Sequence, residues 1–124
     1  MKNKKKAGIW MDHSNAIIME LVSDSIFEQN LMADTKVEEE TSLNKSEKMR
    51  QNKEQHQLTS YYKKLTEIMR NFDEILLFGP TSAKDELLNI LNENHLFDAI
   101  KIEIKKTDKM TEIEMHKLVK EYFK

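Results

Sequence analysis

The chain of 124 residues contains no cysteine, which excludes disulfides, thiolate catalysis, cysteine-based zinc sites and iron–sulfur clusters. It has no apolar run approaching the roughly 18 residues that a membrane-spanning helix needs, so we expect no membrane contact. It also lacks an excess of either charge. Its 20 basic and 22 acidic residues give a net charge of -2, which gives no reason to expect tight general binding to nucleic acid.

The length fits one domain with a modest core. Residues 1–6, MKNKKK, predict a flexible basic tail, and residues 7–124 predict a single domain. The apolar run that follows the tail is broken by polar residues, and no small-residue cleavage site follows, so a signal peptide is not indicated and we expect a cytoplasmic protein.

Residues 33–57 differ in character from the rest of the chain. They are strongly charged, and their few apolar side chains follow no face of a helix or strand. Such a segment cannot bury enough surface to offset the entropy of ordering it. We therefore expect a mobile charged insert, which runs at its end into the first turns of a helix.

Three short runs rich in strand-forming residues open the domain, at residues 7–11, 16–22 and 25–32. Turn-tolerant polar residues separate them. Connections this short join antiparallel strands, because parallel strands need a crossover of about a dozen residues or more. The three runs therefore predict an antiparallel meander.

The second half of the chain alternates between helix and strand patterns. Residues 58–72 repeat apolar side chains at helical spacing, and residues 74–80, EILLFGP, form the continuous apolar run of a central strand. Residues 99–105, AIKIEIK, alternate between apolar and charged side chains, which is typical of an edge strand.

Two further helices are expected. Thr81 or Ser82 caps the first, where Ser82 to Asp85 approximates a capping box, and Thr111 to Glu114 forms a capping box for the second. The residues expected on the core side of this last helix are Met115, Leu118, Val119, Tyr122 and Phe123.

The predicted order is βββ-α-β-α-β-α. A meander followed by right-handed parallel crossovers gives an α/β domain with a five-stranded mixed sheet and helices on both faces. The expected strand order is 3-2-1-4-5, the ribonuclease-H-like arrangement.

Three stretches, GIWMDHSNA, ILLFGPTSAKDEL and TDKMTEIEMHKLVKEYF, resemble a family of small bacterial proteins described as translational-machinery-like. The resemblance skips the insert, and Lys109 stands where the family carries a histidine. The matching residues are Trp10, Asp12, His13, Ala16, Gly79, Pro80, Ala83, Lys84, Asp108, Thr111, Tyr122 and Phe123.

Such proteins resemble the middle domain of archaeal and eukaryotic peptide-chain release factors and the related domain of ribosome-rescue proteins. The resemblance implies the same ribonuclease-H-like fold. Release factors use a Gly-Gly-Gln loop to trigger peptide release, whereas this chain has only Gly8 and Gly79, so the resemblance does not imply that activity.

Polar residues follow the first, fourth and fifth predicted strands. If the first strand is parallel to the fourth, these segments meet at one edge of the sheet, where open α/β sheets bind ligands. The candidate ligand-binding residues are Asp12, His13, Gly79, Thr81, Ser82, Lys84, Asp108 and Thr111.

Asp12 and His13 allow three interpretations. Asp12 can orient His13 as a general base. Asp12 can instead join Glu20 in a ribonuclease-H-type metal site, although Glu20 lies deep in the second strand, and Asp73 and Glu74 lie at the opposite edge, so we expect no metal. In the third interpretation, which we prefer, Asp12 accepts backbone N–H bonds in the turn and His13 helps to close it.

The segment from Gly79 to Lys84 follows a buried strand and opens a helix. Free N–H groups at a helix start favour an anion, and Lys84 can add positive charge, although the segment lacks the second glycine and the Gly-Lys-Ser/Thr end of a P-loop. The simpler interpretation is an N-capped strand-to-helix turn. His56, His95 and His116 show no metal-ligand spacing and are expected on the surface.

We expect a non-catalytic accessory domain without cofactor that contacts RNA or the translation machinery through the strand-end residues. The first alternative is a protein-interaction module or homodimer that uses an exposed edge strand. The second is a small hydrolase that uses Asp12 and His13.

Overall fold

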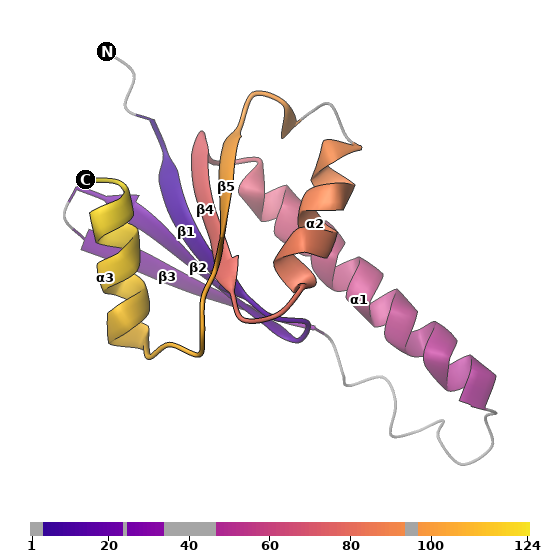
Figure 1. Ribbon diagram of the computed structural model, residues 1–124. Helices are drawn as coiled ribbons and strands as arrows, with labels where there is room; N and C mark the ends of the chain where they lie inside the picture. The colour runs from indigo at the N-terminus through magenta and orange to yellow at the C-terminus, as the bar shows by residue number, and fades with distance from the viewer. Residues whose placement is uncertain (1–3, 24, 34–46, 94–96) are drawn as a thin grey trace.

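A computed structural model describes residues 4–23, 25–33, 47–93 and 97–124, with the side chains of 47–57 left out. The elements of this part of the chain follow one another in the predicted order (Figure 1). They are β1 (Lys6–Met11), β2 (Asn15–Val22), β3 (Ser25–Met32), α1 (Glu47–Met69), β4 (Glu74–Gly79), α2 (Ala83–Asn92), β5 (Lys101–Lys106) and α3 (Glu112–Tyr122).

The five strands form one sheet in the order β3-β2-β1-β4-β5, as the sequence predicts. The meander is antiparallel, while β1 pairs with β4 and β4 pairs with β5 in parallel. Trp10 is paired with Phe78, and Gly79 with Lys106. The carboxyl ends of β1, β4 and β5 therefore share one edge of the sheet.

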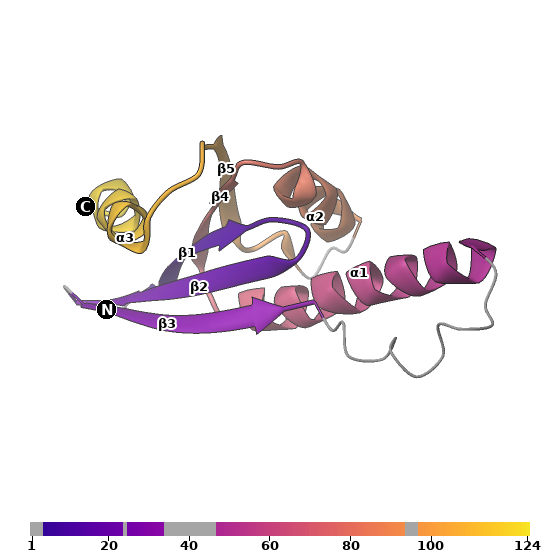
Figure 2. The ribbon, with the colours of Figure 1, turned by 90° about the horizontal axis from the view of Figure 1, so that it is seen from below.

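Helices cover both faces of the sheet, as predicted. Helices α1 and α2 lie on one face and α3 lies on the other (Figures 1 and 2). The larger hydrophobic cluster packs between the sheet and α1 and α2, and includes Ile9, Leu65, Leu77 and Leu87. The smaller cluster lies under α3 and consists of Met19, Leu76, Phe78, Met115 and Val119, with partly buried residues around it.

The two-residue period of a strand divides the apolar side chains of β1 between these two clusters. Ile9 and Met11 are fully buried in the larger cluster, whereas Trp10 packs against the smaller one. Gly8 faces α3 so closely that an added Cβ would lie 2.2 Å from Cγ2 of Val119. Glycine at this position therefore lets α3 pack directly against the strand.

Helix α1 differs from its predicted bounds of 58–72. It begins at Glu47 and ends at Met69, because the chain turns there to enter β4, with the N–H of Asp73 donating to the carbonyl of Lys5 at 2.8 Å. Phe72 lies beyond the end of α1, and its side chain is nevertheless buried. Of the predicted mobile insert, residues 34–46 lie outside the described residues, and α1 includes 47–57.

The predicted exposure of side chains can be compared with the structure in β5 and α3. Strand β5 is an edge strand with alternating exposure, as predicted. The prediction that Tyr122 lies on the core side of α3 is wrong, because its side chain is 37% exposed. Phe123, expected on the same side, does pack against the smaller cluster. No helix in the described part of the chain is long and apolar enough to cross a membrane.

Candidate functional site at the ends of β1, β4 and β5

We call residues 11–14 and 79–86, together with Thr107, the strand-end rim. Hydrogen bonding joins two of them, since the N–H of Thr107 donates to the carbonyl of Gly79 at 3.2 Å. Gly79 has a φ of +153°, and a Cβ added there would lie 2.2 Å from the carbonyl oxygen of Met11. Only glycine allows β4 to end this close to β1.

Asp12 organises the turn between β1 and β2. One carboxylate oxygen accepts from the N–H groups of Ser14 at 2.8 Å and Asn15 at 2.7 Å. The Asp12 N–H donates in turn to the carbonyl of Asn15 at 2.9 Å. These bonds are the ones that the turn interpretation predicts.

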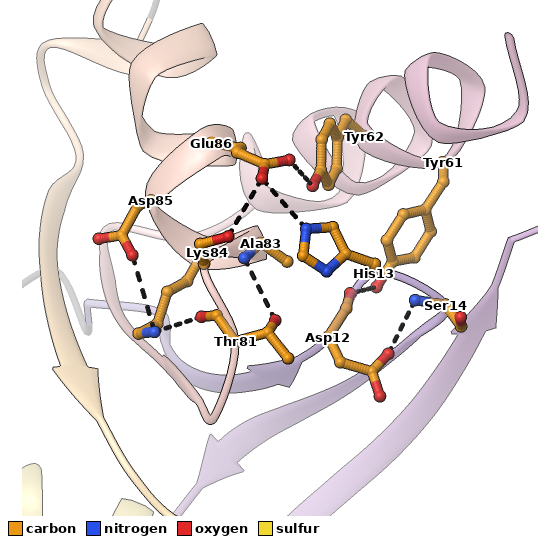
Figure 3. Close-up of polar contacts among 11 residues, drawn as sticks. Asp12, His13, Ser14, Tyr61, Tyr62, Thr81, Ala83, Lys84, Asp85 and Glu86 are labelled. Carbon is orange, nitrogen blue, oxygen red and sulfur yellow. Dashed lines mark hydrogen bonds and ion pairs between the residues drawn. The ribbon is translucent and has the colours of Figure 1, made fainter. Parts of the chain in front are cut away.

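His13 pairs with Glu86 of α2 (Figure 3). Its Nε2 lies 3.1 Å from Oε2 of Glu86, and both side chains are partly exposed, at 42% and 43%. The same carboxylate accepts from the Tyr62 hydroxyl at 2.8 Å and from the Ser82 hydroxyl at 3.2 Å. We call His13, Tyr62, Ser82 and Glu86 the Glu86 network.

Tyr61, the neighbour of Tyr62 on α1, ties the helix to the first turn. Its hydroxyl donates to the carbonyl of Asp12 at 3.0 Å. Two consecutive side chains of α1 thus reach the rim, one to the β1–β2 turn and one to α2 (Figure 3). Both tyrosine side chains are buried, and only their hydroxyl groups reach the rim.

The protonation equilibria of the Glu86 network reflect these contacts. The hydrogen bond from His13 is the largest influence on Glu86 and lowers the pKa of its carboxyl, against a smaller opposing effect of burial. Burial raises the pKa of Tyr62, and its bond to Glu86 raises it further. Burial likewise raises the pKa of Tyr61. At neutral pH the tyrosines are donors and Glu86 is a charged acceptor.

The start of α2 differs from the predicted capping box. Ser82 has φ -78° and ψ 1°, and its side chain makes no cap bond because its hydroxyl donates to Glu86. The Thr81 hydroxyl instead accepts from the N–H of Ala83 at 3.2 Å. The prediction of a capping box from Ser82 to Asp85 is therefore wrong. The Thr81 hydroxyl provides the side-chain cap at the start of α2.

Lys84 occupies an unexpected position. Its side chain is almost fully buried, its Nζ donates to the carbonyl of Thr81, and it lies 3.8 Å from a carboxylate oxygen of Asp85. Asp85 and Glu86 already place negative charge in the first turn of α2, where it complements the helix dipole. A phosphate at this helix start would be repelled by both carboxylates.

Asp108 and Thr111 follow β5 but lead away to the other face of the sheet. Thr111 caps α3, accepting from the N–H of Glu114 at 3.2 Å while its own N–H donates to the Glu114 carboxylate at 3.0 Å. This confirms the predicted capping box. Met110 packs against the smaller cluster, whereas Ala83 belongs to the larger one. The structure therefore gathers Asp12, His13 and residues 79–84, and directs Thr111 toward α3.

The carboxylates considered for a metal site are far apart in the sheet. Glu20 pairs with Ala7 near the start of β1, and Asp73 accepts from the N–H of Lys5 at 2.8 Å, at the edge opposite the rim. Within the described residues no group of three histidine or acidic side chains could hold a metal ion.

The three histidines other than His13 were not candidates for the site. His116 on α3, expected on the surface, is only partly exposed and lies 2.5 Å from a carboxylate oxygen of Glu28 on β3. The side chains of His56 and His95 lie outside the part that the structure describes.

The sheet order and the placement of the helices define an open α/β fold, and solved structures share it. The chain superposes on Archaeoglobus fulgidus Pelota with a TM-score of 0.65 and 11% identity, over 98% of this chain and 34% of that one. It matches Thermoplasma acidophilum Pelota with a TM-score of 0.55 and 12% identity, over 88% and 30%.

An archaeal translation termination factor also matches, with a TM-score of 0.58 and 14% identity over 94% of this chain and 35% of that one. The chain thus spans about a third of the length of these proteins. No protein-family model matches it, and no curated protein matches its sequence. At the level of the fold, the predicted resemblance to release factors is confirmed.

Proposed function

We propose that this chain is a non-catalytic accessory domain that works with the translation machinery. One observation carries the proposal: the fold of a domain of Pelota and of a translation termination factor extends over nearly the whole chain. Because the fold alone supports many functions, the contact surface must be argued from the residues themselves.

The Glu86 network is the surface that we propose for this contact. His13 and Glu86 are partly exposed, and Tyr62 and Ser82 hold the carboxylate in place. A polar pair held in one geometry loses little side-chain entropy when a partner binds. The carboxylates of Asp85 and Glu86 and the engaged ammonium of Lys84 suit polar or basic groups of a protein component better than a phosphate.

The hydrogen-bond partners of Asp12 and His13 agree with a non-catalytic role. Asp12 holds the turn and His13 bonds to Glu86, whereas the hydrolase alternative requires Asp12 to orient His13. The two glycines, Gly8 and Gly79, are both needed for close packing between elements. They supply no counterpart of a Gly-Gly-Gln loop.

The test is sedimentation of native lysate through a sucrose gradient at low and high salt, with detection of this protein. We expect it to move with ribosomal particles at low salt and to be released at high salt. The double variant His13→Ala/Glu86→Gln should reduce the ribosomal fraction several-fold. Sedimentation only at the top of the gradient, at both salts, would contradict the proposal.

The matched control is His116→Ala/Glu28→Gln, which removes a second histidine–glutamate pair between α3 and β3, on the other face. It should leave the ribosomal fraction unchanged. Equal loss in both double variants would remove the rim from the proposal.

The protein-interaction alternative has one observation in its favour. The edge strand β3 carries Phe27, 62% exposed, and Met32, 69% exposed. Static light scattering tests the homodimer form of this alternative: a stable dimer that Phe27→Lys dissociates would favour it, and a monomer at all concentrations would exclude a homodimer.

A further inference from the structure

A second surface lies at the end of the sheet opposite the strand-end rim. Figure 1 shows the start of β1 beside the end of α3 and the end of β2. Two adjoining hollows of about 760 and 290 Å³ lie here and share Leu21, Ser23 and Phe123. We call this surface the lysine groove.

The charge of the lysine groove opposes the net charge of the chain. The larger hollow is lined by Lys4, Lys5 and Lys6, and the smaller one by Lys120 and Lys124. Among the residues that the structure describes, the acidic side chains in the two linings are Glu20 and Glu121. A concave surface lined mainly by one sign of charge focuses the field and attracts the opposite charge, even on a chain whose net charge is -2.

An aromatic ring lies among these lysines. Phe123 lines both hollows, and the Nζ of Lys6 lies 5.9 Å from the centre of its ring. Tyr122 meets the same ring edge-on, with centroids 4.9 Å apart and planes at 86°. Burial and, to a smaller extent, a hydrogen bond to Glu103 raise the pKa of Tyr122 to about 12. These contacts fix the orientation of the Phe123 ring.

We propose that the lysine groove binds a single strand of RNA, with phosphates on the lysines and one base stacked on Phe123. Groove-shaped lysine clusters that surround an aromatic ring fit the alternating charge and ring of a single-stranded polynucleotide. The larger hollow lies within the volume range of sites that enclose a small organic molecule, so it admits a splayed nucleotide.

A duplex hides its bases from Phe123, and a flat anionic membrane does not enter a concave hollow. The inference gives the proposed function a second contact. Only the choice of RNA over DNA rests on that function.

The test uses the purified full chain and a short fluorescein-labelled oligouridylate, followed by fluorescence anisotropy. The substitutions Lys4→Glu and Lys120→Glu reverse one exposed charge in each hollow, and together they should raise the Kd about tenfold or more. Phe123→Leu keeps the apolar packing and removes the stacking surface, which should raise the Kd about fivefold.

The control is Lys63→Glu/Lys64→Glu, which reverses the same number of exposed charges on α1. It should change the Kd by less than about threefold, because these side chains lie outside the groove. Unchanged thermal unfolding of each variant shows that a loss of binding is not a loss of fold. For the native chain, raising the salt from about 50 to about 200 mM should weaken binding about tenfold.

Equal losses in the groove variant and in the α1 control would overturn the proposal. Tighter binding to the annealed duplex, to the matching DNA strand or to phosphatidylserine vesicles than to single-stranded RNA would overturn it as well. Because this assay contains no ribosomes, its outcome is separate from that of the gradient experiment. A chain that binds oligouridylate and stays at the top of the gradient keeps the groove and loses the proposed function.

Discussion

Replacing Gly79 by alanine should strongly lower the free energy of unfolding, because the atom that the added Cβ would meet belongs to the backbone. The added Cβ would lie 2.2 Å from the carbonyl oxygen of Met11, and the φ of +153° is one that other residues rarely adopt. Strained backbone of this kind costs about 1–3 kcal/mol, and separating β4 from β1 adds to it. We expect a loss of about 3 kcal/mol or more from a total stability of about 5–15 kcal/mol.

Gly8 provides the comparison. Its added Cβ would meet Cγ2 of Val119, again at 2.2 Å, but this obstacle is a side chain. Gly8→Ala should therefore cost about 1–3 kcal/mol through overpacking. Val119→Ala, introduced in the same chain, should recover part of that loss, with a coupling energy of about 1–2 kcal/mol. No single side-chain truncation can relieve Gly79→Ala in this way.

Urea unfolding followed by circular dichroism measures all of these variants. The reasoning would be refuted if Gly79→Ala cost less than about 1 kcal/mol, because a real backbone clash cannot be absorbed so cheaply. It would also be refuted if Val119→Ala and Gly8→Ala were additive, since additivity would mean that the two side chains do not meet.

Three further predictions concern single contacts. Because the pKa of Glu86 is lowered, its stabilising contribution is present above the usual value of 4.5 and is lost as the pH falls through the folded value; Glu86→Gln should therefore flatten the acid limb of a plot of unfolding free energy against pH. Thr111→Ala, which removes the capping hydroxyl that accepts from Glu114, should cost about 1 kcal/mol in urea unfolding, and Thr111→Ser should restore most of it. Burial and the bond to Glu103 raise the pKa of Tyr122 to about 12, so an absorbance titration should show no tyrosinate near pH 10, and Tyr122→Phe should remove the first ionisation.

The sheet could be predicted because its signals are local. Residues 99–105 alternate strictly, and short polar turns separate the first three strands, so strand positions and antiparallel pairing followed from neighbouring residues. The end of α1 could not be placed at Met69, because the turn there depends on the bonding of Asp73 to Lys5 across the sheet. Local periodicity contains no information on such a contact.

The candidate site was predicted only in part. Parallel pairing brought Asp12, His13 and residues 79–84 to one edge, as the topology required. Glu86 was missed because it lies 73 residues after His13 and its carboxylate has no distinctive spacing. The adjacent Tyr61 and Tyr62 offered a signal, since buried phenol groups need hydrogen-bond partners. Lys84 could not be predicted as buried, because a lysine next to two acidic residues is typical of an exposed helix start.

The lysine groove could not be predicted either. Lys4 and Lys124 stand at opposite ends of the sequence, and a basic tail alone is most simply a solvated segment. The total charge also conceals the groove, because it averages over acidic and basic faces.

Strand β1 contributes side chains to both hydrophobic clusters, and so does β4. Because both clusters share these two strands, a loss of packing in one cluster disturbs the strands that support the other. Unfolding of α3 would expose Leu76 and Phe78 to water. Water that reaches β1 and β4 would then weaken the packing of Ile9 and Leu77 on the other face of the sheet. We therefore expect the two cores to unfold as a single cooperative unit. A fluorescence probe at Trp10, beside the smaller core, and a probe on α1, over the larger one, should report the same transition midpoint.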